Sequence, residues 1–116
     1  MDDELAALSA AVGAACVASG HVIVSAESCT GGWVAEVLTA TLARSAATIA
    51  LSVTGIAGPG GATLGKPVGT VCFGWAVKGG AERTETRHFD GDRETVRRLS
   101  VRHTLTVLLA LQAVQT

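Results

Sequence analysis

The stretch at residues 21–33, HVIVSAESCTGGW, limits the folds open to this chain more than any other feature. It begins with a short β-branched apolar run, which is typical of a buried strand, and it ends in a turn that leads into a helical pattern. One helical face stays apolar from about Thr30 to Ala46, and a second apolar run, TIALSV, follows. A strand, a turn, a helix and a strand in this order predict two parallel neighbouring strands joined by a crossover helix.

The rest of the chain adds two helices and a hairpin. Residues 3–19 carry Leu5, Leu8, Val12 and Cys16 at helical spacing, so we expect a helix with one buried stripe. Residues 68–77 and 82–89 alternate as strands do, and the KGG turn between them predicts a hairpin that ends in an edge strand. A last helix from Asp92 is expected to bury one stripe: Val96, Leu99, His103 as a core histidine, Val107, Ala110 and Val114.

Together these elements predict a three-layer α/β/α domain, in which a mixed sheet carries helices on both faces. A length of 116 residues suits one domain with a modest core. No repeat or linker divides the sequence, so we expect residues 1–116 to form a single domain.

The composition excludes several classes of partner. A net charge of −1 offers no basic surface for extended nucleic acid, although one small anion needs only one or two arginines. The apolar runs fall well short of the ~20 residues of a membrane span, and the start MDDEL is acidic where a signal peptide would be basic, so we expect a cytoplasmic protein. Three cysteines without CxxC spacing argue against a zinc site and a disulfide framework, and we assign no metal.

The turn at residues 26–32, AESCTGG, leaves backbone N–H groups unpaired at a helix start, with the positive end of the helix dipole behind them. Gly31 and Gly32 remove side chains that would block a ligand, and the Ser28 hydroxyl stands where it could attack a bound carbonyl. The structural alternative is an N-cap followed by glycines that let the helix pack closely on the sheet, and the residues alone favour this alternative slightly.

A glycine-rich segment follows the second predicted strand. Residues 54–67, TGIAGPGGATLGKP, hold five of the chain's 14 glycines and both prolines, so they cannot form regular structure. A loop after a strand end is the usual place for a ligand site in an α/β sheet.

Four segments, AESCTGGW, SVTGIAGPGG, KPVGTV and FDGDRETVRR, occur in this order. In sequence and spacing they closely resemble the CinA C-terminal domain family, whose stand-alone members are nicotinamide-nucleotide amidohydrolases, and the resemblance covers nearly the whole chain. It implies hydrolysis of the carboxamide of nicotinamide mononucleotide to the acid and ammonia, in pyridine-nucleotide salvage. The implied partner is a small nucleotide, and no cofactor is needed.

The resemblance also implies roles for single residues. It places the family nucleophile on Ser28, the cradle of the reacting group on Thr30, Gly31 and Gly32, and the substrate phosphate on Arg93, with Arg97 in reserve. The remaining residues that we assign to the substrate are Glu27, Thr54, Gly55 and Gly58. Two alternatives stay open: Glu27 is equally a carboxylate stabilised at a helix start, and the arginines could form a solvated face paired with Asp90, Asp92 and Glu94.

The chain departs from the family in the middle. Family members have a longer stretch after the SCTGG helix, with a Tyr-Ser-Asn-x-x-Lys segment whose lysine activates the serine. Here EVLTATLARSAAT bridges the same gap, the chain has no tyrosine, and its two lysines are Lys66 and Lys78. Lys66 could act as a substitute base, though an exposed loop lysine is the ordinary interpretation. The alternatives to an enzyme are a non-catalytic nucleotide-binding module and a structural subunit that pairs with another copy; we expect a homo-oligomer.

Overall fold

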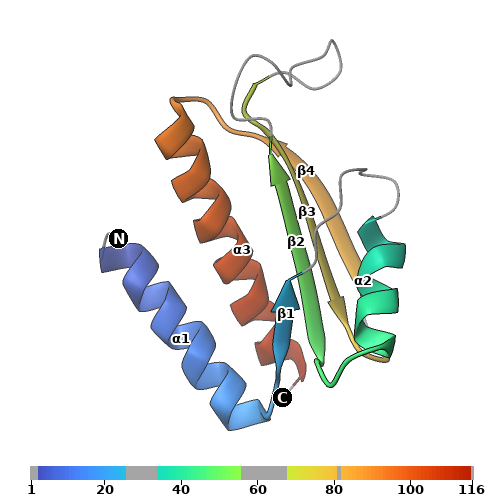
Figure 1. The fold of residues 1–116 in the computed structure, drawn as a ribbon. Helices are drawn as coiled ribbons and strands as arrows, with labels where there is room; N and C mark the ends of the chain where they lie inside the picture. The colour runs from blue at the N-terminus through green and yellow to red at the C-terminus, as the bar shows by residue number, and fades with distance from the viewer. Residues whose placement is uncertain (1–2, 26–33, 56–67, 81, 116) are drawn as a thin grey trace.

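The structure, a computed structural model, describes residues 3–25, 34–55, 68–80 and 82–115. Figure 1 shows three helices around one sheet. In chain order the elements are α1 (Asp3–Ser19), β1 (Ile23–Ser25), α2 (Val34–Ala43), β2 (Ile49–Gly55), β3 (Thr70–Val77), β4 (Glu82–His88) and α3 (Arg93–Gln115).

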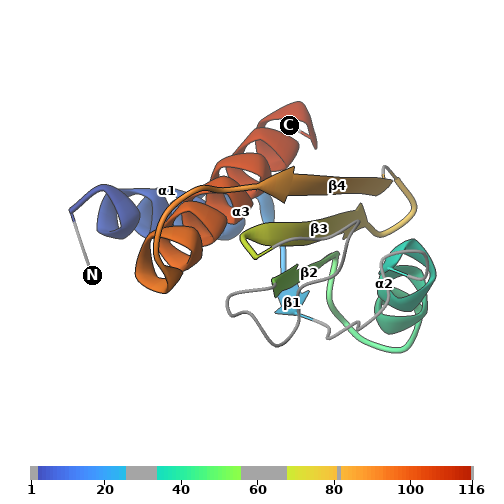
Figure 2. The same cartoon turned by 90° about the horizontal axis from the view of Figure 1, so that it is seen from above.

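The sheet is mixed, as predicted. Its strands lie in the order β1-β2-β3-β4, with β1 parallel to β2 and the other pairs antiparallel. Viewed from above, α1 and α3 cover one face of the sheet and α2 covers the other (Figure 2). The predicted three-layer arrangement and the predicted parallel pair are therefore both confirmed.

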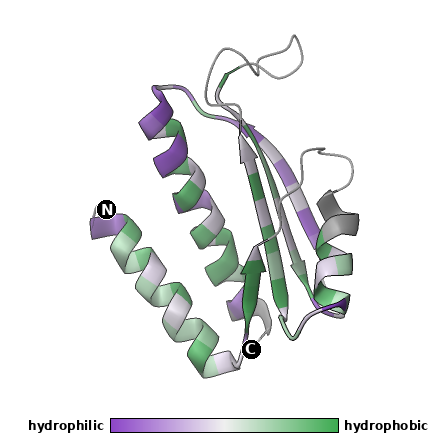
Figure 3. Ribbon diagram, viewed as in Figure 1, coloured by the Kyte–Doolittle hydropathy of each residue, from purple (hydrophilic) through white to green (hydrophobic). Residues whose placement is uncertain are grey.

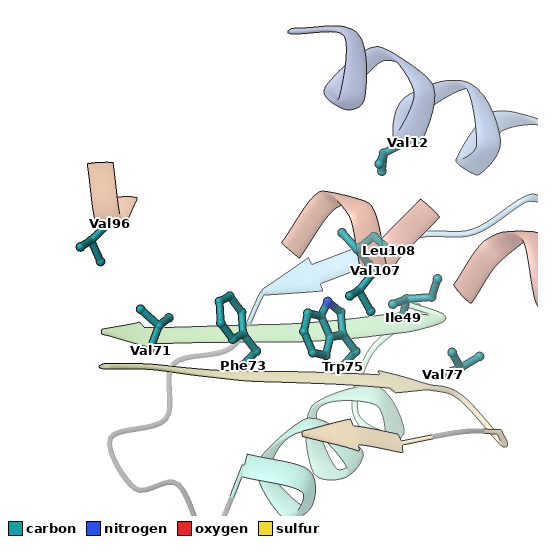
Figure 4. Close-up of a cluster of buried hydrophobic side chains, with 9 residues drawn as sticks. All are labelled: Val12, Ile49, Val71, Phe73, Trp75, Val77, Val96, Val107 and Leu108. Atoms are coloured by element: carbon teal, nitrogen blue, oxygen red, sulfur yellow. The ribbon is translucent and has the colours of Figure 1, made fainter. Parts of the chain in front are cut away.

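The central strand β3 separates large side chains from small ones. Its larger residues, Val71, Phe73, Trp75 and Val77, all belong to the core cluster that also contains Val107 and Leu108 of α3 (Figure 4). The alternate positions carry Thr70, Cys72, Gly74 and Ala76, and Ala76 packs instead with Leu38 and Leu42 of α2. Burying a large apolar side chain contributes roughly 1.5–3 kcal/mol, and β3 buries its large side chains on the α3 face and Ala76 on the α2 face.

The crossover helix α2 is continuous across Ala40 and Thr41, but it ends earlier than expected, at Ala43 rather than Ala46. The Ser45 hydroxyl donates to the Thr41 carbonyl at 2.9 Å and accepts from the Ala47 N–H at 3.3 Å. These local bonds offer the backbone an alternative to another helical turn, which explains the early end.

The stripe predicted for α3 is partly wrong. Val96 and Val107 are buried, but Ala110 is exposed, and Ser100, Thr104 and Gln112 are buried instead (the side chain of Val114 is outside the described part). The Ser100 and Thr104 hydroxyls donate to carbonyls one turn earlier, at 2.7 and 2.8 Å, so their burial leaves no polar group unpaired. The first turns of α3 are mostly hydrophilic and its later turns more hydrophobic (Figure 3).

A polar contact ties α3 to the edge strand β4 over the aromatic core. The His103 ring, predicted as a core histidine, lies edge-on to Phe73 and Trp75, at 4.8 and 5.7 Å between ring centroids. Its Nε2 is 2.5 Å from a Glu85 carboxylate oxygen, and Arg83 Nε donates to the same carboxylate at 3.0 Å. Burial raises the pKa of Glu85, but the hydrogen bonds and charges of Arg83 and His103 outweigh it and lower that pKa from 4.5 to about 2.

We expect Glu85→Gln to lower the free energy of unfolding at pH 7 by roughly 1–3 kcal/mol, because it removes the charge from these hydrogen bonds. The folded pKa lies below the unfolded value, so the stabilisation is present above about pH 4.5 and is lost as the pH falls toward 2. Urea unfolding at pH 7 and pH 3 measures both quantities, with Glu94→Gln, on exposed helix surface, as control. A Glu85→Gln penalty that is unchanged at pH 3 would contradict the assignment.

Candidate functional site

Several helix and strand ends lie together at one edge of the sheet, beginning with the carboxyl end of β2 (Figure 1). β1 runs parallel to β2 toward this edge, but it ends at Ser25, opposite Leu51, whereas β2 continues to Gly55. The antiparallel pairings bring the start of β3 and the end of β4 to the same edge, and α3 begins beside them. The described parts of three motifs, at residues 52–55, 68–71 and 89–98, therefore lie at this edge or lead away from it, and β1 ends directly before the fourth, AESCTGGW.

Gly69 joins two of these motifs. Its carbonyl accepts from the Phe89 N–H at 2.9 Å, and the neighbouring Val68 carbonyl lies 2.9 Å from His88 Nε2. Gly69 has φ +94°, and a Cβ at this position would come within 2.3 Å of the Phe89 carbonyl oxygen. Glycine is therefore required where KPVGTV meets FDGD. The predicted strand began at residue 68, but β3 begins at Thr70, so Gly69 lies just before the strand and not within it.

Asp92 fixes the start of α3 and thus the position of Arg93. Its Oδ1 accepts from the Thr95 N–H at 2.8 Å, and its carbonyl accepts the Val96 N–H at 3.0 Å, as in a helix N-cap. The Thr95 side chain, and then its backbone N–H, lower the pKa of Asp92 by hydrogen bonding. The D-x-x-T spacing of Asp92 and Thr95 is the signal in the sequence from which this cap could have been predicted.

The four arginines of the first half of α3 divide into two pairs. Arg98 and Arg102 both bind Glu4 of α1, at 2.9 and 3.2 Å. Arg93 and Arg97 are exposed, stand one helical turn apart, and form no ion pair with any residue that the structure describes. Two exposed cations thus stand near the start of α3.

If Arg93 and Arg97 formed a solvated, ion-paired face, their partners would be Asp90, Asp92 and Glu94. Asp92 caps α3, and Asp90 lies 3.5 Å from the His88 ring. Within the described residues none of Asp90, Asp92 and Glu94 forms an ion pair with Arg93 or Arg97, although both arginines are exposed, as a solvated face requires.

Thr54 lies on the other face of the sheet. In the β2–β3–β4 register it stands opposite Cys72, which in turn stands opposite Thr86, and the Cys72 sulfur is 3.7 Å from the Thr86 hydroxyl. This row belongs to the face that α2 covers, whereas α3 and its arginines lie across the sheet. The structure therefore brings Thr54, Gly55, Arg93 and Arg97 to one edge without bringing Thr54 to the side of the arginines.

Several predicted residues lie outside the described part of the chain: Glu27, Ser28, Thr30, Gly31, Gly32, Gly58 and Lys66. The other lysine, Lys78, follows β3 at the opposite edge of the sheet, where its Nζ donates to the Ser45 carbonyl at 3.1 Å. Lys78 is therefore too far from the β1–β2 carboxyl edge to act on a group bound there.

The described residues contain no cluster of His, Cys, Asp or Glu side chains that could hold a metal ion. The helices among them include none that is long and apolar enough to cross a membrane.

Comparisons with known proteins agree on one relationship. The sequence model of the CinA C-terminal domain matches residues 39–112. The Escherichia coli K12 protein named nicotinamide-nucleotide amidohydrolase PncC is 34% identical over 155 residues, which cover 92% of this chain and 94% of that protein. An alignment longer than the 116-residue chain means that the E. coli protein contains residues with no counterpart here.

Solved structures show the same likeness. The competence/damage inducible protein CihA of Agrobacterium tumefaciens superposes with a TM-score of 0.76 at 26% identity, over 96% of this chain and 97% of that one. The competence damage-inducible protein A of Klebsiella pneumoniae gives a TM-score of 0.72 at 30% identity, over 97% and 98% of the two chains.

The crowding at Gly69 generates a stability prediction with a matched control. Gly79 also has positive φ, +70°, but a Cβ there would meet nothing within 4 Å. We expect Gly69→Ala to lower the free energy of unfolding by about 2 kcal/mol more than Gly79→Ala. Both substitutions force a left-handed backbone on alanine, but the new Cβ clashes with the Phe89 carbonyl oxygen in the Gly69→Ala variant alone. Chemical denaturation of the two variants measures the difference, and equal losses would show that the edge relaxes around a side chain.

Proposed function

Because the chain belongs to the CinA C-terminal domain family, we propose that it binds nicotinamide mononucleotide at the edge where β1 and β2 end. The observation that carries this proposal is the exposed pair Arg93 and Arg97 at the start of α3, beside the strand ends that lead into the ESCTGG and TGIAGP motifs. A relative of 34% identity is named for this class of substrate. We treat residues 1–116 as one domain built around this site.

In this proposal the phosphate binds at the start of α3. A guanidinium group forms two parallel, charge-assisted hydrogen bonds to a phosphate, and the positive end of the α3 dipole adds to the attraction. Arg93 is the first residue of α3, and the Asp92 cap holds it in place. Arg97, one turn later on the same side, can contact a second phosphate oxygen.

The proposed reaction starts at Ser28. Its oxygen attacks the carboxamide carbon of the nicotinamide, and the N–H groups around Thr30, Gly31 and Gly32 stabilise the oxyanion. The C–N bond then breaks, and the nitrogen leaves as ammonia with the proton lost by the serine. Water hydrolyses the resulting ester, which gives nicotinic acid mononucleotide and restores the hydroxyl. Glu27, Gly55 and Gly58 would line the substrate in this cytoplasmic salvage reaction, and Thr54, which lies on the α2 face of the sheet, would contact it from the side opposite Arg93 and Arg97.

The weak point of this reaction is the base. A serine hydroxyl is a poor nucleophile at neutral pH unless a neighbouring group takes its proton. Lys78 is bound to Ser45 at the opposite edge, which leaves Lys66 as the remaining lysine. The continuous α2 and the extra residues of the E. coli relative favour a second candidate function, a nucleotide-binding module with little turnover.

Binding is tested first, because both candidates require it. We expect Arg93→Gln to weaken nicotinamide mononucleotide binding by about 10- to 100-fold, since it removes a charge-assisted pair of hydrogen bonds. Isothermal titration calorimetry measures the effect, and nicotinamide riboside, which has no phosphate, is the matched control ligand. An equal loss for both ligands would mean that Arg93 does not bind the phosphate.

Hydrolysis separates the two candidates. We expect ammonia release from nicotinamide mononucleotide by this chain to stay near background. A chain with a Tyr-Ser-Asn-x-x-Lys segment restored between Ala40 and Thr41 should hydrolyse this substrate. The Ser28→Ala substitution in that restored chain should abolish the hydrolysis. A coupled ammonia assay measures both.

Strong turnover by the chain as it stands would overturn this expectation. Lys66→Met would then be compared with Lys78→Met, because a substitute base at residue 66 predicts that the first variant alone abolishes the reaction.

A further inference from the structure

A cavity of about 250 Å³ lies on α3 beside the end of β4. Its walls are Phe89, which follows β4, and four residues of α3: Leu99, Arg102, His103 and Thr106. Side chains two residues apart project about 200° from each other round a helix, so Arg97 lies on the opposite side of α3 from Leu99. The cavity is therefore distinct from the edge at which we propose that the substrate binds.

One side of the cavity is apolar and aromatic. Phe89 and Leu99 are half-buried. The rings of Phe89 and His103 both lie edge-on to the buried ring of Phe73, at 6.3 and 4.8 Å between ring centroids. Aromatic rings favour edge-on and offset contacts with one another, so these walls favour a ligand that carries a planar ring.

Arg102 brings a positive charge to the cavity. Its Nε lies 3.2 Å from Glu4 Oε1, and Arg98 Nη2 lies 2.9 Å from the same oxygen. Two guanidinium groups thus share one carboxylate oxygen, and the Arg102 contact uses neither of its Nη groups. These two Nη groups form a fork that matches the two oxygens of a carboxylate.

The groups around the cavity do not neutralise this charge. His103 Nε2 is bound to Glu85, and Arg83 and Arg87 contact the same carboxylate at 2.5 and 3.4 Å. Glu85 therefore has more cationic partners than its single charge offsets. None of the described residues that line the cavity is acidic. A local excess of positive charge, in a chain whose net charge is −1, favours an anionic ligand here.

We propose that this cavity binds a small aromatic monocarboxylate, whose ring packs against Phe89, Leu99 and His103 and whose carboxylate binds the Nη groups of Arg102. The volume lies below the roughly 300–1,000 Å³ of pockets for drug-sized ligands, so it suits a single ring. A nucleotide, with its base, sugar and phosphate, is too large for it. This inference does not rest on the proposed function.

Benzoate is the probe, and benzamide, which has nearly the same shape without the charge, is the control ligand. We expect benzoate, titrated into the native chain and followed by ¹⁵N–¹H NMR spectra, to cause saturable shifts of the backbone amides at residues 89, 99, 102, 103 and 106. Benzamide should bind about 10-fold more weakly or worse, because it cannot form charge-assisted hydrogen bonds with the guanidinium group.

Arginine variants test the role of Arg102. Arg102→Gln should weaken benzoate binding about 10-fold or more. Arg98→Gln is the matched control, because it removes the other guanidinium group on Glu4 but does not line the cavity, and its affinity should stay within about threefold of the native value. Arg93→Gln should leave the affinity for benzoate unchanged, which separates this cavity from the proposed phosphate site. Far-ultraviolet circular dichroism verifies that the variants fold.

Three results would overturn the proposal. The first is a native chain that shows no saturable benzoate binding, or shifts only at the strand ends of residues 52–55 and 68–71. The second is an equal affinity for benzoate and benzamide. The third is an equal loss of affinity in Arg98→Gln and Arg102→Gln, which would mean that benzoate responds to the general charge of α3 and not to a site built around Arg102.

Discussion

Phe73 and Trp75 stack on one face of the central strand β3 with ring centroids 5.6 Å apart, and β2, β4 and α3 all contact this pair. Both residues are 1% exposed, and His103 of α3 lies edge-on to both rings. The opposite face of β3 is made of small side chains, which leaves room for the short helix α2 to approach. One strand thus decides which helix lies on which side of the sheet.

The candidate site depends on this arrangement indirectly, through the position of α3. The aromatic core and the Glu85–His103 contact hold α3 along β4, and the Asp92 cap then starts the helix at the edge where the strands carrying the motifs end. Gly69 closes the same edge by joining the start of β3 to the end of β4. Arg93 and Arg97 are presented there because Arg98 and Arg102, on the neighbouring side of the helix, are engaged with Glu4.

The crossover helix α2 runs without a break across Ala40 and Thr41 and joins the parallel strands β1 and β2. The large buried side chains lie mainly on β3 and α3, so the core of the domain is built mainly outside this connection. Among the described residues the lysine is Lys78, which is bound at the opposite edge of the sheet, away from the ends of β1 and β2.

Local pattern alone determined most of this protein: the order of elements, the mixed sheet, the hairpin between β3 and β4, and the helices on both faces of the sheet. These follow from periodicity and chain connectivity, which act between near neighbours. The tertiary structure decided what depends on contacts between distant residues. Ala110 turned out exposed and Gln112 buried, because the faces that α3 buries are set by the β3 aromatic rings and by α1 rather than by its own period. Pairing with Glu4, ninety-odd residues away in the chain, separates Arg98 and Arg102 from Arg93 and Arg97. No spacing rule within the sequence could assign those partners, because the arginines are chemically identical and differ only in what the fold places beside them.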